Sequence, residues 1–211
     1  MTEVPPAVYL VEDDEAVRDA VSVVLQTAAI RVYSFANAEE LLVDYDGSHP
    51  HCLLLDVRLP GMTGLELQQR LRTEAPGVPI ILITGHADVS LARQAFKAGV
   101  IDVIEKPVDA AVLLTAVETA FGVARGLARE RNRRFEIARR LGMLTQRERE
   151  VMERVVAGDT NKVVAGNLGI SPRTVEIYRR RVMEKLQART LPDLVRIAGQ
   201  ADVFEDAFAP G

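Results

Sequence analysis

Residues 52–64 read Cys-Leu-Leu-Leu-Asp-Val-Arg-Leu-Pro-Gly-Met-Thr-Gly, and this stretch decides the fold of the first half of the chain. Its apolar run, Cys52–Leu55, shows no alternation with polar residues and stops at Asp56. Such a run is typical of a strand buried on both faces, as in a parallel sheet covered by helices. A loop with proline and glycine follows, and then the helical pattern of Leu65–Leu71.

The same alternation of short strand and amphipathic helix extends on both sides of this stretch. The expected strands are Ala7–Val11, Arg31–Phe35, Cys52–Leu55, Ile80–Ile83 and Ile101–Ile104. The expected helices lie at Val17–Leu25, Ala38–Val43, from Leu65, at Leu91–Ala98 and from Asp109 toward Arg125. Five strands alternating with five helices predict an α/β fold, a doubly wound five-stranded parallel sheet with helices on both faces.

Composition excludes several classes of protein. Hydrophobic residues make up 48% and charged residues 27% of the 211 residues, as in soluble globular proteins. The single cysteine, Cys52, excludes an internal disulfide and a multi-cysteine zinc site. No apolar run is long enough to span a bilayer, and the N-terminus lacks the basic region of a signal peptide. We therefore expect a cytoplasmic protein with no membrane partner.

Charge is distributed unevenly between two halves. Residues 1–120 carry 8 basic and 18 acidic side chains, whereas residues 121–211 carry 18 basic and 12 acidic ones. An acidic half joined to a basic half predicts two domains with different partners. The basic half is the candidate for binding nucleic acid, although solvated helix surfaces are often basic as well.

Polar residues end the expected strands of the acidic half. They are Glu12 and Asp13, Asp56, Thr84 and Lys106. The carboxyl ends of parallel strands meet at one edge of the sheet, where ligands bind. Three clustered carboxylates need a cation, and Mg²⁺ is the usual one where phosphate also binds. Asp56 is then the candidate nucleophile for a phosphoryl group, whose oxygens Thr84 and Lys106 can hold. A single aspartate at a strand end is more often a helix cap, but five such residues on one edge favour a site.

Four segments resemble the receiver domain of two-component response regulators, which has a flavodoxin-like fold. They are Val11–Glu15, Leu54–Gly64, Ile83–His86 and Glu105–Pro107. The resemblance covers residues 5–123 and assigns 1–123 to the receiver. It implies that Asp56 accepts a phosphoryl group from a sensor histidine kinase. The implied Mg²⁺ ligands are Asp13, Asp56 and the backbone carbonyl of Arg58, with Glu12 acting through water.

The resemblance also implies how phosphorylation is sensed. Thr84 and Lys106 correspond to the residues that sense and neutralise the phosphoryl group, and the Lys106–Pro107 peptide is expected to be cis. The chain departs from the family at Val103, where many receivers carry a Tyr or Phe that turns inward on phosphorylation. A switch based on an aromatic rotamer is therefore excluded at that position.

The basic half begins with a connector. Residues 124–140 are charge-rich and helix-prone, and they predict either an extension of the fifth helix or a flexible tether. Thr145 with Glu148 forms a capping-box pattern that starts a helix. A second short helix is expected at Asn161–Leu168, and a third helix, capped by Ser171, follows the turn at Gly169. This order is the helix-turn-helix signature.

The third helix of this half has two distinct faces at 100° per residue. Its packing face is expected to contain Val175, Tyr178, Val182 and Leu186. The opposite sector and its flank hold the candidates for contacting bases in the major groove, which are Arg173, Thr174, Glu176, Ile177, Arg180 and Arg181. For an isolated helix, a solvated charged surface would be the more common explanation.

Residues 141–200 resemble the four-helix output domain of LuxR, NarL and FixJ regulators. The matching segments are Leu144–Val151, Gly158, Asn161-Lys162, Ile170–Val175 and Lys185-Leu186. The resemblance implies phosphate contacts from Thr160, Asn161 and Lys162, and a dimerising fourth helix at 191–197. The loop 84–88 and residues 191–198 resemble FixJ-type regulators in particular. Residues 201–211 are expected to be a disordered tail.

The sequence therefore predicts a response regulator that controls transcription, usually as an activator. Its expected partners are a sensor histidine kinase, promoter DNA, RNA polymerase and, after phosphorylation, a second copy of the chain. The only expected chemistry is Mg²⁺-dependent phosphoryl acceptance and self-dephosphorylation.

Two other classes of function remain open at this stage. A haloacid-dehalogenase-like phosphatase would need a carboxylate two residues after its nucleophile, where this chain has Arg58. A regulated module that binds protein instead of DNA would lack the salt dependence that phosphate contacts confer.

Overall fold

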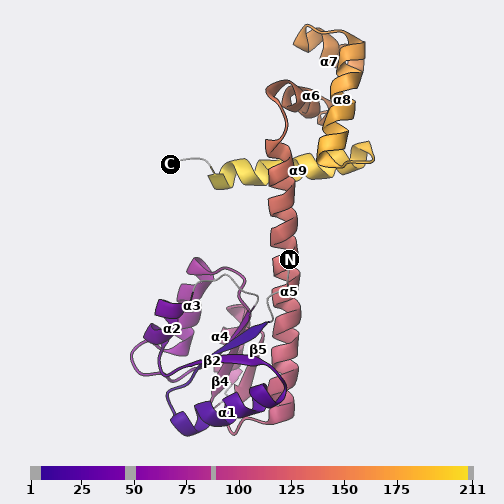
Figure 1. Cartoon of the computed structure of the whole chain (residues 1–211). Coiled ribbons are helices and arrows are strands. Elements are labelled where there is room, and N and C mark those ends of the chain that lie inside the picture. Colours follow the sequence, from indigo (N-terminus) through magenta and orange to yellow (C-terminus); the bar gives the residue numbers. More distant parts are fainter. Residues whose placement is uncertain (1–5, 46–50, 87–88, 209–211) are drawn as a thin grey trace. The chain divides into compact units, whose positions relative to one another are not determined.

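The computed structural model describes residues 6–45, 51–86 and 89–208 of the chain. These residues form two compact units, Met1–Arg129 and Glu130–Gly211, which are described separately (Figure 1). The boundary between the units falls inside the segment 124–140 that the sequence marks as a connector.

The first unit is a five-stranded parallel sheet with the strand order β2-β1-β3-β4-β5. The strands are β1 (Ala7–Val11), β2 (Arg31–Phe35), β3 (His51–Asp56), β4 (Ile80–Thr84) and β5 (Asp102–Glu105). The helices are α1 (Glu15–Thr27), α2 (Ala38–Asp44), α3 (Gly64–Glu74), α4 (Val89–Lys97) and α5 (Ala110–Gly142). The predicted α/β fold is confirmed, with element ends shifted by a few residues.

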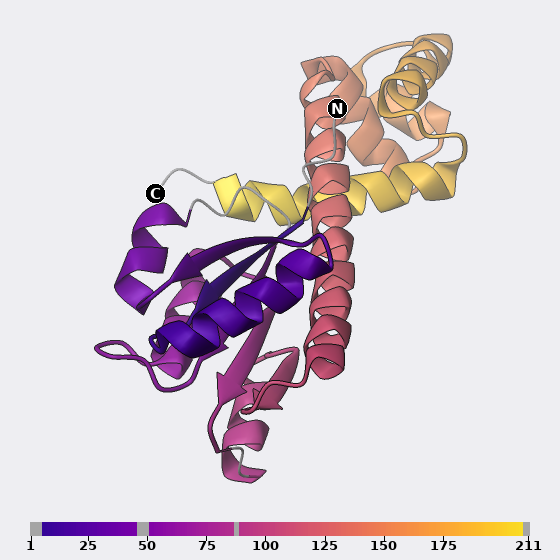
Figure 2. The ribbon, with the colours of Figure 1, turned by 60° about the horizontal axis from the view of Figure 1, so that its bottom comes forward.

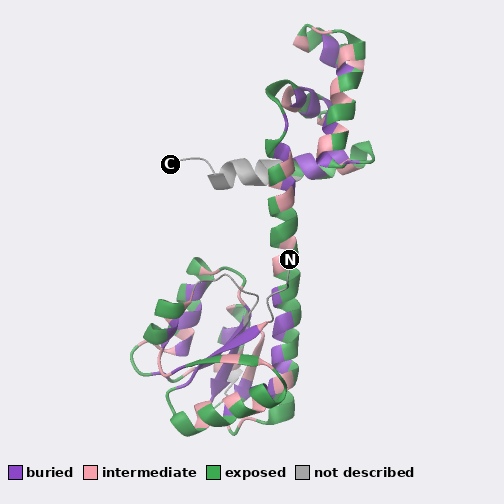
Figure 3. Ribbon diagram, in the orientation of Figure 1, coloured by how far each residue is buried: buried purple, intermediate pink, exposed green. Residues whose placement is uncertain are grey.

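Alternating side chains of each strand face two separate hydrophobic layers. Leu53, Leu55 and Leu82 pack with α2, α3 and α4 on one face of the sheet. Leu54 and Ile81 pack with α1 and α5 on the other face. Figure 2 shows α1 lying across the strands, and Figure 3 shows that the central strands are buried. Burial on both faces is the reason that these strands are continuous apolar runs.

Polar caps fix where the helices of this unit begin. The Asp14 carboxylate accepts from the amides of Ala16 and Val17 and so starts α1 directly after the strand-end residues of β1. Thr63 and Glu66 form a capping box at the start of α3. Such caps satisfy amides that have no partner inside the helix. Residues of the preceding loops therefore fix where α1 and α3 begin.

Helix α5 is a single 33-residue helix that includes the connector residues 124–140. Its first part packs in the core of the first unit through Leu113, Val117 and Phe121. By length and composition it is the one helix among the described residues that would suffice to cross a membrane. Its contacts with the sheet identify it instead as the core helix of a soluble domain.

The second unit is all helical. After the end of α5 it contains α6 (Gln146–Val156), α7 (Asn161–Leu168), α8 (Pro172–Leu186) and α9 (Leu191–Phe208). Its core joins Ile137 and Leu141 of α5 with Val151, Val164 and Val182. The turn residue Gly169 has a φ of 64°, the left-handed conformation that glycine adopts without strain. The predicted helix-turn-helix is confirmed, including the capping box of Thr145 and Glu148.

Helix α9 has the bounds Leu191–Phe208. The disordered tail expected at residues 201–211 stays a prediction. Residues 209–211 lie outside the described part of the chain.

Candidate phosphoryl-acceptor site and DNA-binding surface

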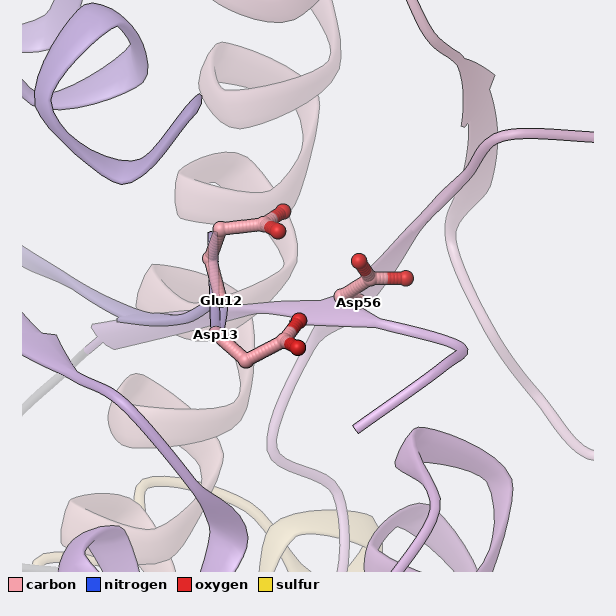
Figure 4. A group of neighbouring side chains, drawn as sticks. All are labelled: Glu12, Asp13 and Asp56. Carbon is pink, nitrogen blue, oxygen red and sulfur yellow. The ribbon is translucent and has the colours of Figure 1, made fainter. Parts of the chain in front are cut away.

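Three carboxylates meet at the carboxyl ends of β1 and β3. Glu12 and Asp13 directly follow β1, and Asp56 is the last residue of β3. One carboxylate oxygen from each residue lies within 4.8 Å of the others, and Figure 4 shows the carboxyl groups of Glu12 and Asp13 extending to the side on which Asp56 lies. Glu12 and Asp56 are buried, whereas Asp13 is exposed. Since β1 and β3 are hydrogen-bonded neighbours, the topology alone brings these residues together.

The ammonium group of Lys106 binds two of these carboxylates. Its Nζ donates to Oδ2 of Asp56 at 2.6 Å and to Oε1 of Glu12 at 2.8 Å. Oδ1 of Asp56 accepts instead from the backbone amide of Arg58 at 2.9 Å. Lys106 follows β5, and its own amide donates to the carbonyl of Thr84. The strand order therefore holds the lysine beside the carboxylate of Asp56.

Burial and the neighbouring charges shift the pKa values of Glu12 and Lys106 in opposite directions. Burial raises the pKa of Glu12, and the hydrogen bond from Lys106 only partly offsets that effect. Burial also opposes the charge of Lys106, but its hydrogen bonds to Asp56 and Glu12 outweigh burial and raise its pKa. The lysine is therefore charged at neutral pH, which is the state that neutralises an anion.

The donor set fits a divalent cation with oxygen ligands. Oε2 of Glu12 lies 2.8 Å from Nζ of Lys106, but it is buried and accepts no hydrogen bond from the described residues. A buried carboxylate oxygen in this state calls for a further cation or water. Carboxylate and carbonyl oxygens are the ligands that Mg²⁺ prefers. The acidic pocket is thus consistent with a divalent metal site.

The remaining predicted receiver residues lie at the same end of the sheet. Thr84 ends β4 and is buried, and its hydroxyl accepts from the amide of His86 at 3.2 Å. Arg58 is exposed in the loop after Asp56. Val103 lies half-buried in β5 opposite Leu82 and carries no aromatic ring, as the sequence states. The Lys106–Pro107 peptide is cis, as expected.

Two features of this site escaped the sequence analysis. Arg18 donates from Nη1 to the carbonyls of Glu12, at 2.7 Å, and Asp13, so it holds the β1–α1 loop. Gly64 touches the backbone of Asp56 so closely that an added Cβ would lie 2.1 Å from the Asp56 carbonyl oxygen. Two signals in the sequence point to these contacts: the basic residue Arg18 one turn into α1, and Gly64 at the start of α3.

The helix-turn-helix of the second unit presents most of the predicted DNA-binding residues to solvent. Val175, Val182 and Leu186 of α8 are buried and Tyr178 is half-buried, as the two-faced helix predicts. Figure 3 shows the exposed side of α8. The exposed candidates are Thr160, Lys162, Arg173, Glu176, Ile177, Arg180 and Arg181. Asn161 and Thr174 are half-buried, and the Thr174 hydroxyl is hydrogen-bonded to the cap residue Ser171 at 2.7 Å.

Two side-chain pairs that sequence reasoning missed hold this surface together. Nη1 of Arg179 donates to Oδ1 of Asn161 at 2.7 Å, which ties α8 to the first turn of α7. Nζ of Lys185 donates to Oε2 of the buried Glu148 at 2.6 Å and to the carbonyl of Met143. Arg179 lies beside the packing sector of α8 in the run Arg179-Arg180-Arg181, so a finer division of the helix faces would have singled it out.

The fold and this site together define a class of protein, a receiver domain joined to a helix-turn-helix output domain. The sequence profile of the response regulator receiver domain matches residues 8–118, and that of the luxR family of bacterial regulatory proteins matches residues 142–198. The chain belongs to the two-component response regulators with a LuxR-type DNA-binding domain, and it is a FixJ-like transcriptional regulator.

Individual relatives support the same assignment. The transcriptional regulatory protein FixJ of Azorhizobium caulinodans is 41% identical over 199 residues, which cover 93% of this chain and 93% of the relative. The response regulator protein TodT of Pseudomonas putida is 35% identical and covers 93% and 87%. The solved structure of the response regulator StyR has a TM-score of 0.83 at 34% identity and covers 93% of this chain and all of that one. Full-length FixJ from B. japonicum has a TM-score of 0.56 at 39% identity, over 96% and 99%. These relatives are regulators of transcription or response regulators and not enzymes.

Proposed function

We propose that Asp56 is the phosphoryl acceptor of this response regulator and that a sensor histidine kinase is the donor. The observation that carries the proposal is the contact of 2.6 Å between Lys106 Nζ and Asp56 Oδ2, beside two further carboxylates. A carboxylate oxygen of Asp56 attacks phosphorus, the bond from phosphorus to the donor histidine nitrogen breaks, and an acyl phosphate forms. Lys106 keeps its charge and pairs with the new phosphoryl oxygens.

Asp13, Asp56 and the Arg58 backbone carbonyl are the proposed direct ligands of Mg²⁺, with Glu12 acting through water. The ion supplies neutralisation of the charge on the phosphoryl group when it is bound. Oε2 of Glu12 is buried, contacts only the ammonium group of Lys106 among the described cations, and accepts no hydrogen bond from the described residues, which supports this assignment. Thr84 is the proposed sensor, because the hydroxyl partner that it has among the described residues is the loop backbone at His86, and it can exchange that partner for a phosphoryl oxygen.

The second unit is proposed to read promoter DNA with α8 and to grip phosphates at the start of α7. Arg173, Thr174, Glu176, Ile177, Arg180 and Arg181 form the proposed base-reading and flanking set. The first amides of α7 have no acceptor within the helix, so phosphate contacts are proposed for Thr160, Asn161 and Lys162. Positive charge on the exposed side of α8 supports this role.

Phosphorylation is proposed to couple the two units by producing a homodimer that binds two half-sites. The cytoplasmic regulator then recruits RNA polymerase and activates transcription, and self-dephosphorylation ends the signal. The proposed dimer face lies around α4 and β5.

The experiment that tests the acceptor is incubation with acetyl phosphate and Mg²⁺, followed by mass spectrometry of the intact chain. We expect one added phosphoryl group that is absent in Asp56→Asn and present in Asp109→Asn, an exposed aspartate that caps α5. Equal labelling of Asp56→Asn would overturn the assignment.

A further inference from the structure

The three carboxylates of the acceptor site differ in what holds them. The carboxylates of Glu12 and Asp56 both accept from Lys106, and Asp56 also accepts from the amide of Arg58. The carboxylate of Asp13 is exposed, and within the described part of the chain it forms no hydrogen bond or ion pair. Its direction therefore depends on the backbone of residue 13, which limits the rotamers that the side chain can adopt.

That backbone is held by a cation one turn into α1. Between the end of β1 at Val11 and the start of α1 at Glu15 lie three residues. Nη1 of Arg18 donates to the carbonyl of Glu12 at 2.7 Å and to that of Asp13 at 3.3 Å. The shorter distance is typical of a hydrogen bond from a charged donor. One guanidinium nitrogen thus bridges the two consecutive carbonyls of the residues that carry the carboxylates.

Arg18 makes this contact in a strongly acidic environment. Residues 12–15 and residue 19 are all acidic, yet Arg18 forms no ion pair with a carboxylate of any described residue. Both hydrogen bonds of its half-buried side chain go to backbone carbonyl oxygens. The arginine therefore fixes the backbone of Glu12 and Asp13 while it leaves their carboxylates available to another cation.

We propose that Arg18 is a positioning residue for Mg²⁺ binding, which holds the Asp13 carboxylate beside those of Glu12 and Asp56. This inference rests on the proposed Mg²⁺ site. The charge of Arg18 by itself would have the opposite effect, because two cations repel each other. Removal of the arginine should therefore weaken Mg²⁺ binding if positioning dominates, and strengthen it if charge repulsion dominates.

A titration of the full chain with Mg²⁺ at constant ionic strength, followed by backbone amide NMR, measures this sign. Arg18→Met should raise the dissociation constant about tenfold, as expected when a group that orients a metal ligand is lost. Arg18→Lys keeps the charge and a shorter donor, so it should raise the constant less, by about threefold. Arg70→Met is the matched control, since it removes an exposed cation of α3 that pairs with Glu74 at 2.8 Å, and it should leave the constant unchanged.

The rate of Asp56 labelling by acetyl phosphate separates positioning from a general structural defect. Arg18→Met should need about tenfold more Mg²⁺ for half-maximal labelling, but its rate at saturating Mg²⁺ should stay within about twofold of wild type. The reason is that Arg18 hydrogen-bonds neither Asp56 nor Lys106. A distorted site would instead lower the rate at saturating Mg²⁺, and that result would overturn the proposal.

The remaining outcomes distinguish this inference from the proposed function on which it rests. If wild type binds Mg²⁺ and Arg18→Met binds it equally or more tightly, the role of Arg18 is overturned and the metal site stands. Equal weakening in Arg70→Met would overturn the role as well, because the net charge of the domain would then be the cause. Absence of saturable Mg²⁺ shifts in wild type would overturn the metal site and this inference together.

Discussion

Arg179 of α8 donates a hydrogen bond of 2.7 Å to Oδ1 of Asn161, the first residue of α7. The two helices of the helix-turn-helix are thereby joined at the surface proposed to meet DNA. Because Oδ1 of Asn161 accepts from Arg179, the orientation of the side-chain amide is fixed. Its amino group can then donate to another acceptor, such as a DNA phosphate. Arg179 is therefore a positioning residue for the phosphate contact proposed for Asn161.

Replacing Arg179 by Met should weaken DNA binding by about 1 kcal/mol without changing base preference, because a positioning hydrogen bond is lost. The measurement is a binding titration against single-base operator variants, with Arg154→Met as a control on an exposed side of α6. In a double-mutant cycle, Asn161→Ala should add little to Arg179→Met. Fully additive losses would show that Arg179 acts independently of Asn161.

Substitution of Arg180 should remove a base contact, whereas substitution of Lys162 should remove a phosphate contact. Arg180 has 72% of its side-chain surface exposed, and its only described partner, Glu184, is 4.0 Å away. Arg180→Ala should reduce the free energy of DNA binding by about 1–3 kcal/mol and relax the base preference at one position of the operator. Lys162→Ala should weaken binding to all operator sequences equally. It should also reduce the slope of log affinity against log salt concentration by about one. If Arg180→Ala weakens binding to every operator variant alike at two salt concentrations, Arg180 contacts phosphate. The base contacts would then come from Glu176, Ile177 or Arg173.

Removal of Asp13 should impair Mg²⁺ binding more than removal of Glu12. Asp13 is exposed and has no described cation partner, whereas Glu12 already binds Lys106. Glu12→Ala should cost about 10–100-fold in affinity, as for an outer-shell ligand, and Asp13→Ala should cost more. Isothermal titration with Mg²⁺ measures both, and Glu12→Gln serves as the variant that preserves volume. The opposite order would refute the assignment of direct and water-mediated ligands.

Gly64→Ala should disturb the acceptor site through backbone contact alone. The new Cβ would lie 2.1 Å from the carbonyl oxygen of Asp56, so the loop after β3 must move. We expect the receiver to lose about 1–3 kcal/mol of stability by overpacking, together with slower labelling of Asp56. Gly122→Ala in α5 is the control, since no atom lies near its Cβ, and it should leave stability equal or raise it by up to about 1 kcal/mol. Similar behaviour of the two variants would contradict this account.

The ion pair of Lys185 and Glu148 should make the second unit sensitive to acid. Burial alone would raise the pKa of Glu148, but the hydrogen bonds from Lys185 and Thr145 outweigh it and lower that pKa. The stabilisation is present above the pKa of the unfolded glutamate, about 4.3, and is lost as pH falls toward the lower folded value.

Lys185→Met should therefore lower the free energy of unfolding at neutral pH by about 1–3 kcal/mol, since buried Glu148 loses its cation. The loss relative to wild type should shrink below pH 4, as followed by urea unfolding. Arg154→Met, from a partly exposed pair with Asp159 at 3.8 Å, should change stability by less than about 1 kcal/mol. A loss for Lys185→Met that stays constant from pH 7 to pH 3 would exclude the pair as its source.

The sequence by itself determined the sheet, the helix-turn-helix and which carboxylates lie together at the carboxyl ends of the strands. Continuous apolar runs ending in Glu12, Asp13 and Asp56 are local signals, and parallel topology then places strand ends on one edge. Caps such as Thr145 and Ser171 are likewise local, because a side chain and an amide three residues away form each of them.

Only the tertiary structure decided which side chains pair across elements. Lys106 meets Asp56 across 50 positions of sequence, and Arg179 meets Asn161 across 18. The same holds for the contact of Gly64 with the Asp56 carbonyl. Hydrophobic pattern fixes which face of an element is buried, whereas the distance between two particular atoms follows from the packing of the whole domain.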